Sequence, residues 1–132
     1  MGQPAAKQGD QITATDTHII LVPAPPGPPV PTPIPHPFTG IIDGSLSSDV
    51  NIGGMAAATM NSTATNTPPH IPIGGTFASP PSNRATIIKG SVTVNINGKA
   101  AARSGDIAKT CNDPVDLPVG TVVAAGTVMI GG

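Results

Sequence analysis

Proline restricts the conformation of this chain more than any other residue type. Nine of the fifteen residues from 23 to 37 are proline. Because proline lacks a backbone N–H and has a fixed φ, this segment is expected to form neither a helix nor a central strand, and extended polyproline geometry is predicted. A rigid loop or spacer needs no partner, and we favour it over a proline-rich ligand for a recognition domain. We therefore treat 23–37 as a proline-rich insertion.

The rest of the composition favours β-structure. The 132 residues include 16 glycines, 17 prolines and no glutamate, and the larger apolar residues are 14 Ile, 10 Val, 3 Leu and 2 Phe. β-Branched residues suit strands, and this apolar content is enough to build a core. We expect an all-β chain that forms a single domain over residues 1–132.

Charge and cysteine content exclude several classes of function. Six basic and seven acidic residues give a net charge of −1, and the chain has no Trp or Tyr. Such a surface neither neutralises phosphates nor stacks bases, so no nucleic-acid partner is expected. The single cysteine cannot form an internal disulfide. Because no apolar run is long enough for a signal peptide or a membrane span, we expect any export to use another route.

A short pattern occurs three times along the chain. Residues 50–55, 94–99 and 128–132 share a Val-x-Ile-(Gly/Asn)-Gly frame. Each copy predicts a short strand that enters a tight turn, and Asn97-Gly98 is a typical two-residue hairpin turn. The copies begin about 44 and 34 residues apart. This spacing is too irregular for a solenoid or a propeller.

Alanine pairs and triplets follow the repeated frame. Residues 56–58 and 100–102 are alanine after the first two copies. The third copy lies at the end of the chain and gains an equivalent only if it meets Pro4-Ala5-Ala6. That pairing would give three strand–turn–Ala-Ala units. We therefore predict three lobes of one small domain with approximate threefold symmetry.

Three histidines and one cysteine are candidate metal ligands. They are His18, His36, His70 and Cys111. Their spacing does not match the short ligand intervals of zinc fingers. However, His36 and His70 both lie among prolines and are followed by a Gly and a Phe, while His18 and Cys111 both follow a Gly-Asp pair. Together they would complete a tetrahedral Cys-His₃ zinc site with no open position.

The main enzymatic alternative uses Cys111 as a nucleophile. Such a protein would be a zinc- or thiol-dependent hydrolase acting as a secreted effector, with a histidine near the thiolate. The flanking residues match no recognised catalytic signature. The seven aspartates are dispersed, and Gly9-Asp10 and Gly105-Asp106 read as turns rather than paired catalytic carboxylates. The chain contains no phosphate-binding loop motif.

Two stretches resemble the proline-alanine-alanine-arginine (PAAR) repeat proteins. They are Pro-Ala-Ala-Lys-Gln-Gly-Asp at 4–10 and Gly-Ser-Val-Thr-Val-Asn-Ile-Asn-Gly-Lys-Ala-Ala-Ala-Arg-Ser-Gly-Asp at 90–106. With the other copies, the resemblance covers nearly the whole chain apart from the proline-rich insertion. Lys7 replaces the motif's Arg and Ala100 its Pro, and the middle copy at 55–59 lacks both the Arg and the following Gly-Asp.

The resemblance implies a fold and a function. PAAR proteins are small cones with a threefold-like β base and a zinc ion near the apex, and they cap the trimeric β-helical spike of type VI secretion systems and related contractile injection particles. Their ligands, carried over by position, fall on His18, His36, His70 and Cys111. The implied protein is a structural tip rather than an enzyme. It is a monomer bound to a trimeric spike of the valine-glycine repeat type.

The resemblance also implies how such a tip is used. It would be made in the bacterial cytoplasm without a signal peptide, assembled at the spike tip and ejected on contraction. It would touch the target membrane transiently and carry effectors non-covalently. Because the chain stops at residue 132, the resemblance implies a stand-alone tip without a fused effector.

Overall fold

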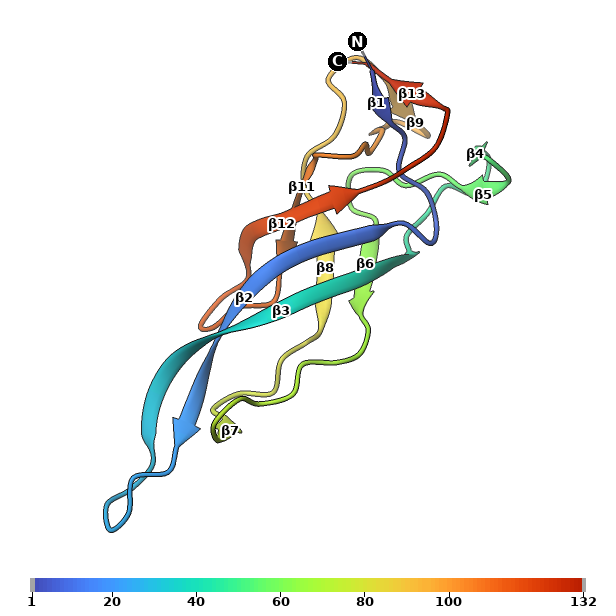
Figure 1. The fold of residues 1–132 in the computed structure, drawn as a ribbon. Coiled ribbons are helices and arrows are strands. Elements are labelled where there is room, and N and C mark those ends of the chain that lie inside the picture. Colours follow the sequence, from blue (N-terminus) through green and yellow to red (C-terminus); the bar gives the residue numbers. More distant parts are fainter. Residues whose placement is uncertain (1, 132) are drawn as a thin grey trace.

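The computed structural model describes residues 2–131, which form an elongated molecule built of strands (Figure 1). The described residues contain no helix, so the predicted all-β class is confirmed. Accordingly, no helix in this part of the chain is long and apolar enough to cross a membrane. The strands are β1 (Gln3–Pro4), β2 (Gln11–Val22), β3 (Val30–Gly44), β4 (Asn51–Ile52), β5 (Met55–Ala56), β6 (Thr63–Asn66), β7 (Thr76–Phe77), β8 (Arg84–Ile87), β9 (Asn95–Ile96), β10 (Lys99–Ala100), β11 (Ile107–Thr110), β12 (Leu117–Val123) and β13 (Met129–Ile130).

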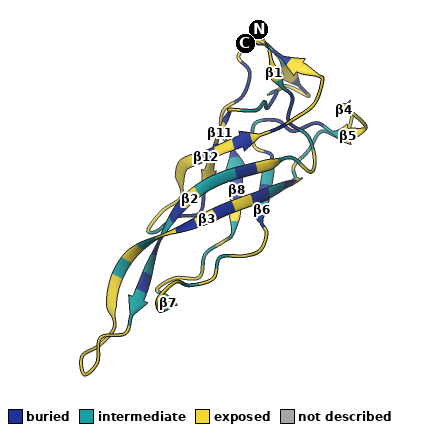
Figure 2. Ribbon diagram, in the orientation of Figure 1, coloured by how far each residue is buried: buried dark blue, intermediate teal, exposed yellow. Residues whose placement is uncertain are grey.

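Six strands close into a ring in the middle of the molecule. The order is β2-β3-β6-β8-β11-β12 and back to β2, and every neighbouring pair is antiparallel. Inward-facing residues alternate with outward-facing ones along each strand (Figure 2). The interior is filled by Ile12, Phe38, Ile42, Ile87 and Val122, together with several alanines. The small alanine side chains let the strands enclose a narrow core.

Three two-stranded antiparallel sheets, two of them hairpins, form the end of the molecule that holds both termini, which we call the hairpin end (Figure 1). They are β4–β5, β9–β10 and β1–β13. The first two turn through residues with positive φ, Gly53-Gly54 and Asn97-Gly98, as the hairpin signals predict. In the third, Gln3 pairs with Ile130, so the two ends of the chain meet as expected. Gly132 of the third frame lies outside the described residues.

A closed cycle of backbone hydrogen bonds joins the three alanine segments. The Ala6 N–H donates to the Ala102 carbonyl at 2.9 Å, Ala102 donates to Ala58 at 3.1 Å, and Ala58 donates to Ala6 at 3.0 Å. All three alanines are fully buried. Around them, matched bridges pair Ala5 with Arg103, Lys7 with Ala57, and Thr59 with Ala101. The predicted threefold likeness is confirmed, because the same contact occurs three times around one axis.

The chain makes the same turn after each alanine segment. The turning residues have positive φ: they are Gly9 at 93°, Asn61 at 79° and Gly105 at 92°. The next side chain accepts the backbone N–H three residues before it; these acceptors are Asp10, Ser62 and Asp106. The middle copy therefore keeps the turn with Asn61-Ser62 in place of Gly-Asp. Asparagine tolerates this conformation better than most residues do, and a serine hydroxyl can replace the carboxylate.

Strands β2 and β3 continue beyond the closed sheet as a projecting hairpin (Figure 1). We call residues 17–35 the arm. Pairing runs without a break from Gln11–Ile41 to Val22–Val30. The expectation of a proline spacer is therefore wrong for 30–37, which form part of β3; only 23–29 connect the two strands.

The positions of the prolines explain how they fit in a strand. Pro31, Pro33, Pro35 and Pro37 alternate with residues that keep their N–H. In an antiparallel pair every second N–H points toward the partner, so these prolines occupy the outward positions. Over this stretch β3 pairs only with β2. This part of β3 is an edge strand, so the N–H groups that proline lacks would have faced solvent and no hydrogen bond between strands is lost.

Candidate metal centre

The four predicted ligands come from all three lobes. His18 lies on β2 and His36 on β3, His70 lies in the connection after β6, and Cys111 directly follows β11. Their side chains are buried; His18 is 0%, His36 1% and Cys111 3% exposed. The site lies beyond the closed sheet, where the core narrows. Any ion held there would tie together three segments that are far apart in sequence.

The three imidazole rings surround a common space. The ring centroids of His18 and His70 are 4.9 Å apart, those of His18 and His36 5.6 Å, and those of His36 and His70 5.7 Å. Three histidines on one tetrahedral ion at bonds of about 2.0–2.1 Å place their ring centroids about 5 Å apart. The His18 Nε2 atom is 3.7 Å from the Cys111 Sγ atom. Nitrogen and sulfur ligands of one zinc ion are about 3.6 Å apart.

Asp16 is a buried member of the site that the sequence analysis missed. Ligand atoms of Asp16, His18, His70 and Cys111 all lie within 4.8 Å of one another. The Asp16 Oδ2 atom accepts from the His70 Nε2–H at 2.9 Å and lies 3.4 Å from Cys111 Sγ. Its Oδ1 atom accepts from the Thr110 hydroxyl. The signal was available in the Asp-x-His pattern, because residues 16 and 18 of a strand share one face.

Two buried imidazole nitrogens have no hydrogen-bond partner among the described residues. They are His36 Nε2 and His18 Nδ1. His36 donates its Nδ1–H to the Ile34 carbonyl at 2.9 Å, which leaves the lone pair of Nε2 free. The His18 Nδ1 atom lies 3.4 Å from an Asp113 carboxylate oxygen, so its other nitrogen, Nε2, faces Cys111. An orphaned, buried nitrogen such as His36 Nε2 is suited to hold a metal ion. His36 is nevertheless not one of the four residues whose ligand atoms all lie within 4.8 Å of one another.

A comparison with protein-family models assigns the chain to a family. The model of the PAAR motif matches residues 32–115. The chain belongs to the PAAR motif family. A comparison with curated proteins found no match. Three of the four predicted ligands, His36, His70 and Cys111, lie within the matched range, while His18 and Asp16 precede it.

Burial controls the ionisation of the PAAR chain's site. Burial lowers the pKa of His18, against the opposing effect of the Asp113 carboxylate. Burial, and next the negative charge of Asp16, raise the pKa of the Cys111 thiol to about 11. The metal-free site therefore holds a neutral imidazole and a neutral thiol at pH 7, and a metal ion must displace the thiol proton.

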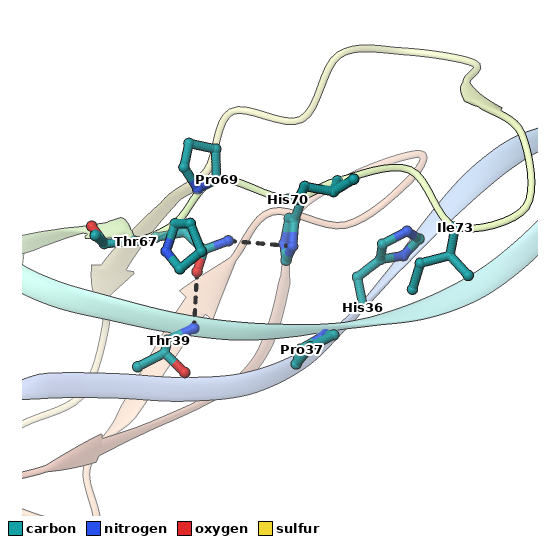
Figure 3. Close-up of a pocket in the computed structure, with 10 residues that line it drawn as sticks. His36, Pro37, Thr39, Thr67, Pro69, His70 and Ile73 are labelled. Atoms are coloured by element: carbon teal, nitrogen blue, oxygen red, sulfur yellow. Dashed lines mark hydrogen bonds between the residues drawn. The ribbon is translucent and has the colours of Figure 1, made fainter.

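A hollow of about 340 Å³ leads from the surface to the histidines (Figure 3). It is lined by His36, Pro37, Thr39, Asn66, Thr67, Pro68, Pro69, His70, Ile71 and Ile73. Asn66 links two other lining residues: its side-chain oxygen accepts the Thr39 N–H at 2.9 Å, and its amide nitrogen lies 3.2 Å from His70 Nδ1. The hollow provides a path by which an ion can reach His36 and His70.

Proposed function

We propose that this PAAR protein is the structural tip of a contractile injection machine, either a type VI secretion system or a related extracellular particle. It would cap a trimeric β-helical spike of the valine-glycine repeat type as a monomer. The observation that carries the proposal is the hydrogen-bond cycle of Ala6, Ala58 and Ala102. A single chain with three equivalent lobes can satisfy three identical subunits at once.

The hairpin end supplies the contact surface in this proposal. Its three sheets are only two strands wide, so their outer edges carry unpaired backbone groups. Such edges can extend a partner sheet by strand pairing. Apolar side chains are exposed at the same end, including Met55, Val92, Val128 and Met129. Burying them against the spike would add hydrophobic stabilisation.

The proposed metal is one structural zinc ion held by His18, His36, His70 and Cys111. The orphaned Nε2 of His36 and the ring and sulfur spacings described above support it. Bound zinc supplies no reaction here; it cross-links three lobes and contributes folding free energy on the order of 10 kcal/mol. The residues of this chain orient the ligands: Ile34 fixes the tautomer of His36, and Asp113 lies behind His18.

A non-catalytic role fits the chemistry of Cys111 better than the hydrolase alternative. A cysteine nucleophile must be a thiolate near neutral pH. Cys111 is 3% exposed, and its pKa is raised to about 11. The protonated, buried thiol is therefore inert toward substrates in solution.

The end of the molecule opposite the hairpins is suited to membrane passage. Residues 17–42 include no Asp, Glu, Lys or Arg, and the arm ends in exposed prolines. An uncharged, stiff projection crosses an apolar layer at lower desolvation cost than a charged one. In this proposal the tip is made in the bacterial cytoplasm, is ejected with the spike and its effectors, and touches the target membrane only transiently.

Binding to a spike tests the proposal. We would mix the protein with a purified trimeric valine-glycine repeat spike from the same organism and measure the stoichiometry by native mass spectrometry. One chain per trimer is expected. Val92→Asp and Met129→Asp, at the hairpin end, should weaken binding at least tenfold, whereas Val30→Asp on the arm should not. Folded protein that ignores the spike, or that binds three chains per trimer, would refute the proposal.

A further inference from the structure

Asp16 is the carboxylate that the proposed zinc site leaves without a role. It is 0% exposed, and its neighbours are His70, Cys111 and Thr110. No lysine or arginine is paired with it among the ion pairs of the described residues. A buried carboxylate without a cationic partner is costly. We propose that Asp16 is itself a metal ligand.

The hydrogen-bond partners of Asp16 Oδ2 are themselves proposed zinc ligands. The Oδ2 atom accepts a hydrogen bond from the His70 Nε2–H at 2.9 Å and another from the Cys111 S–H at 3.4 Å. Ligand atoms of Asp16, His18, His70 and Cys111 all lie within 4.8 Å of one another. Such separations allow one ion to be bound by several of these atoms at once.

The behaviour of His70 leads to the same conclusion in both of its possible states. If His70 binds the ion through Nε2, it gives up the proton that it shares with Asp16, and the metal becomes the remaining partner for Oδ2. If His70 keeps that proton, its other nitrogen is not available to the ion while it keeps its 3.2 Å contact with the Asn66 amide. In that state Asp16 takes the place that the proposed site gives to His70, and with His18, His36 and Cys111 it completes a tetrahedron.

Charge balance also favours Asp16. A divalent ion with one thiolate and neutral histidines leaves a net charge of +1 in a buried site, and an added carboxylate makes the total zero. The Asp113 carboxylate does not replace it, because it faces the Nδ1 of His18 and accepts the Ile19 N–H. Asp16 Oδ2, 2.9 Å from the His70 Nε2 atom, lies within the group of donors.

The inference rests on the proposed zinc site, and one experiment separates the two. We would determine the crystal structure of the zinc-loaded protein with anomalous data at the zinc edge. We expect an Asp16 Oδ2–zinc distance of about 2.0–2.2 Å. Zinc bound by His and Cys ligands with Oδ2 hydrogen-bonded elsewhere would overturn the inference and leave the proposed site intact. Wild-type protein that binds no zinc would overturn both.

Zinc affinity, measured by competition with a chromophoric chelator, gives an independent test. Asp16→Asn keeps the shape of the side chain and should weaken zinc binding more than 100-fold, since it removes a ligand. Asp113→Asn is the matched control, and we expect a loss of about tenfold because that residue acts only through His18. Circular dichroism would check that both variants keep the fold. Equal losses in the two folded variants would show that Asp16 is only a positioning residue.

Discussion

Because of Cys111, the metal-free protein is expected to lose stability at alkaline pH. Burial and the Asp16 charge raise its pKa from the ordinary 9.0 to about 11. The folded state therefore retains the thiol proton over a range where the unfolded state loses it, and the free energy of unfolding falls as pH rises from 9 to 11. Each pKa unit corresponds to about 1.4 kcal/mol, so the loss is about 1.4 kcal/mol at pH 10 and approaches 3 kcal/mol above pH 11.

The assay is urea unfolding of chelator-treated protein, followed by circular dichroism at pH 8, 9, 10 and 11. Cys111→Ala removes the titrating thiol and should lower the free energy of unfolding at pH 8 but flatten its decline above pH 9. The chain contains no tyrosine, so phenol ionisation does not contribute in this range. Parallel pH profiles for wild type and Cys111→Ala would refute the reasoning, because the decline would then arise elsewhere.

Three further predictions concern packing and strand edges. Ala58→Val should cost about 1–3 kcal/mol in urea unfolding because the hydrogen-bond cycle leaves no room for added methyl groups, whereas Val at the exposed Ala78 should cost little. Ser62→Ala should cost about 1–3 kcal/mol, since the hydroxyl of the buried Ser62 accepts the Thr59 N–H and donates to the Ser45 carbonyl. The double variant Pro33→Ala, Pro35→Ala restores two outward N–H groups on β3 and should promote self-association, measured by light scattering against wild type; unchanged scattering would contradict the blocked edge.

Local patterns in the sequence were enough to predict the symmetric part of the fold. The repeated Val-x-Ile-(Gly/Asn)-Gly frame identified the hairpins, and the need of its third copy for an alanine pair, met by Pro4-Ala5-Ala6, led to the joining of the two chain ends. These features depend on short-range turn chemistry, which a sequence displays directly. The prediction of the Gly9-Asp10 and Gly105-Asp106 turns is confirmed for the same reason.

What the sequence analysis missed depends on pairing at long range. Proline content excluded a helix or a central strand at 30–37 and favoured a rigid loop or spacer, whereas the structure shows an edge strand with alternate prolines. The Asn61-Ser62 turn does not resemble Gly-Asp in sequence. It is recognised only by the positive φ of Asn61 and by the Ser62 hydroxyl, which accepts the Thr59 N–H. Asp16 became visible as a site residue only when β2 placed it beside Cys111, 95 positions away.

The single-chain threefold cycle has a statistical consequence for any partner with true threefold symmetry. Such a partner meets three nearly equal faces, so the same complex can form in three rotational orientations, and this multiplicity favours association by RT ln 3, about 0.6 kcal/mol. An unequal distribution among the orientations must arise where the lobes differ. Lys7, Thr59 and Arg103 occupy one equivalent position with three different side chains, and they would determine which orientation is populated.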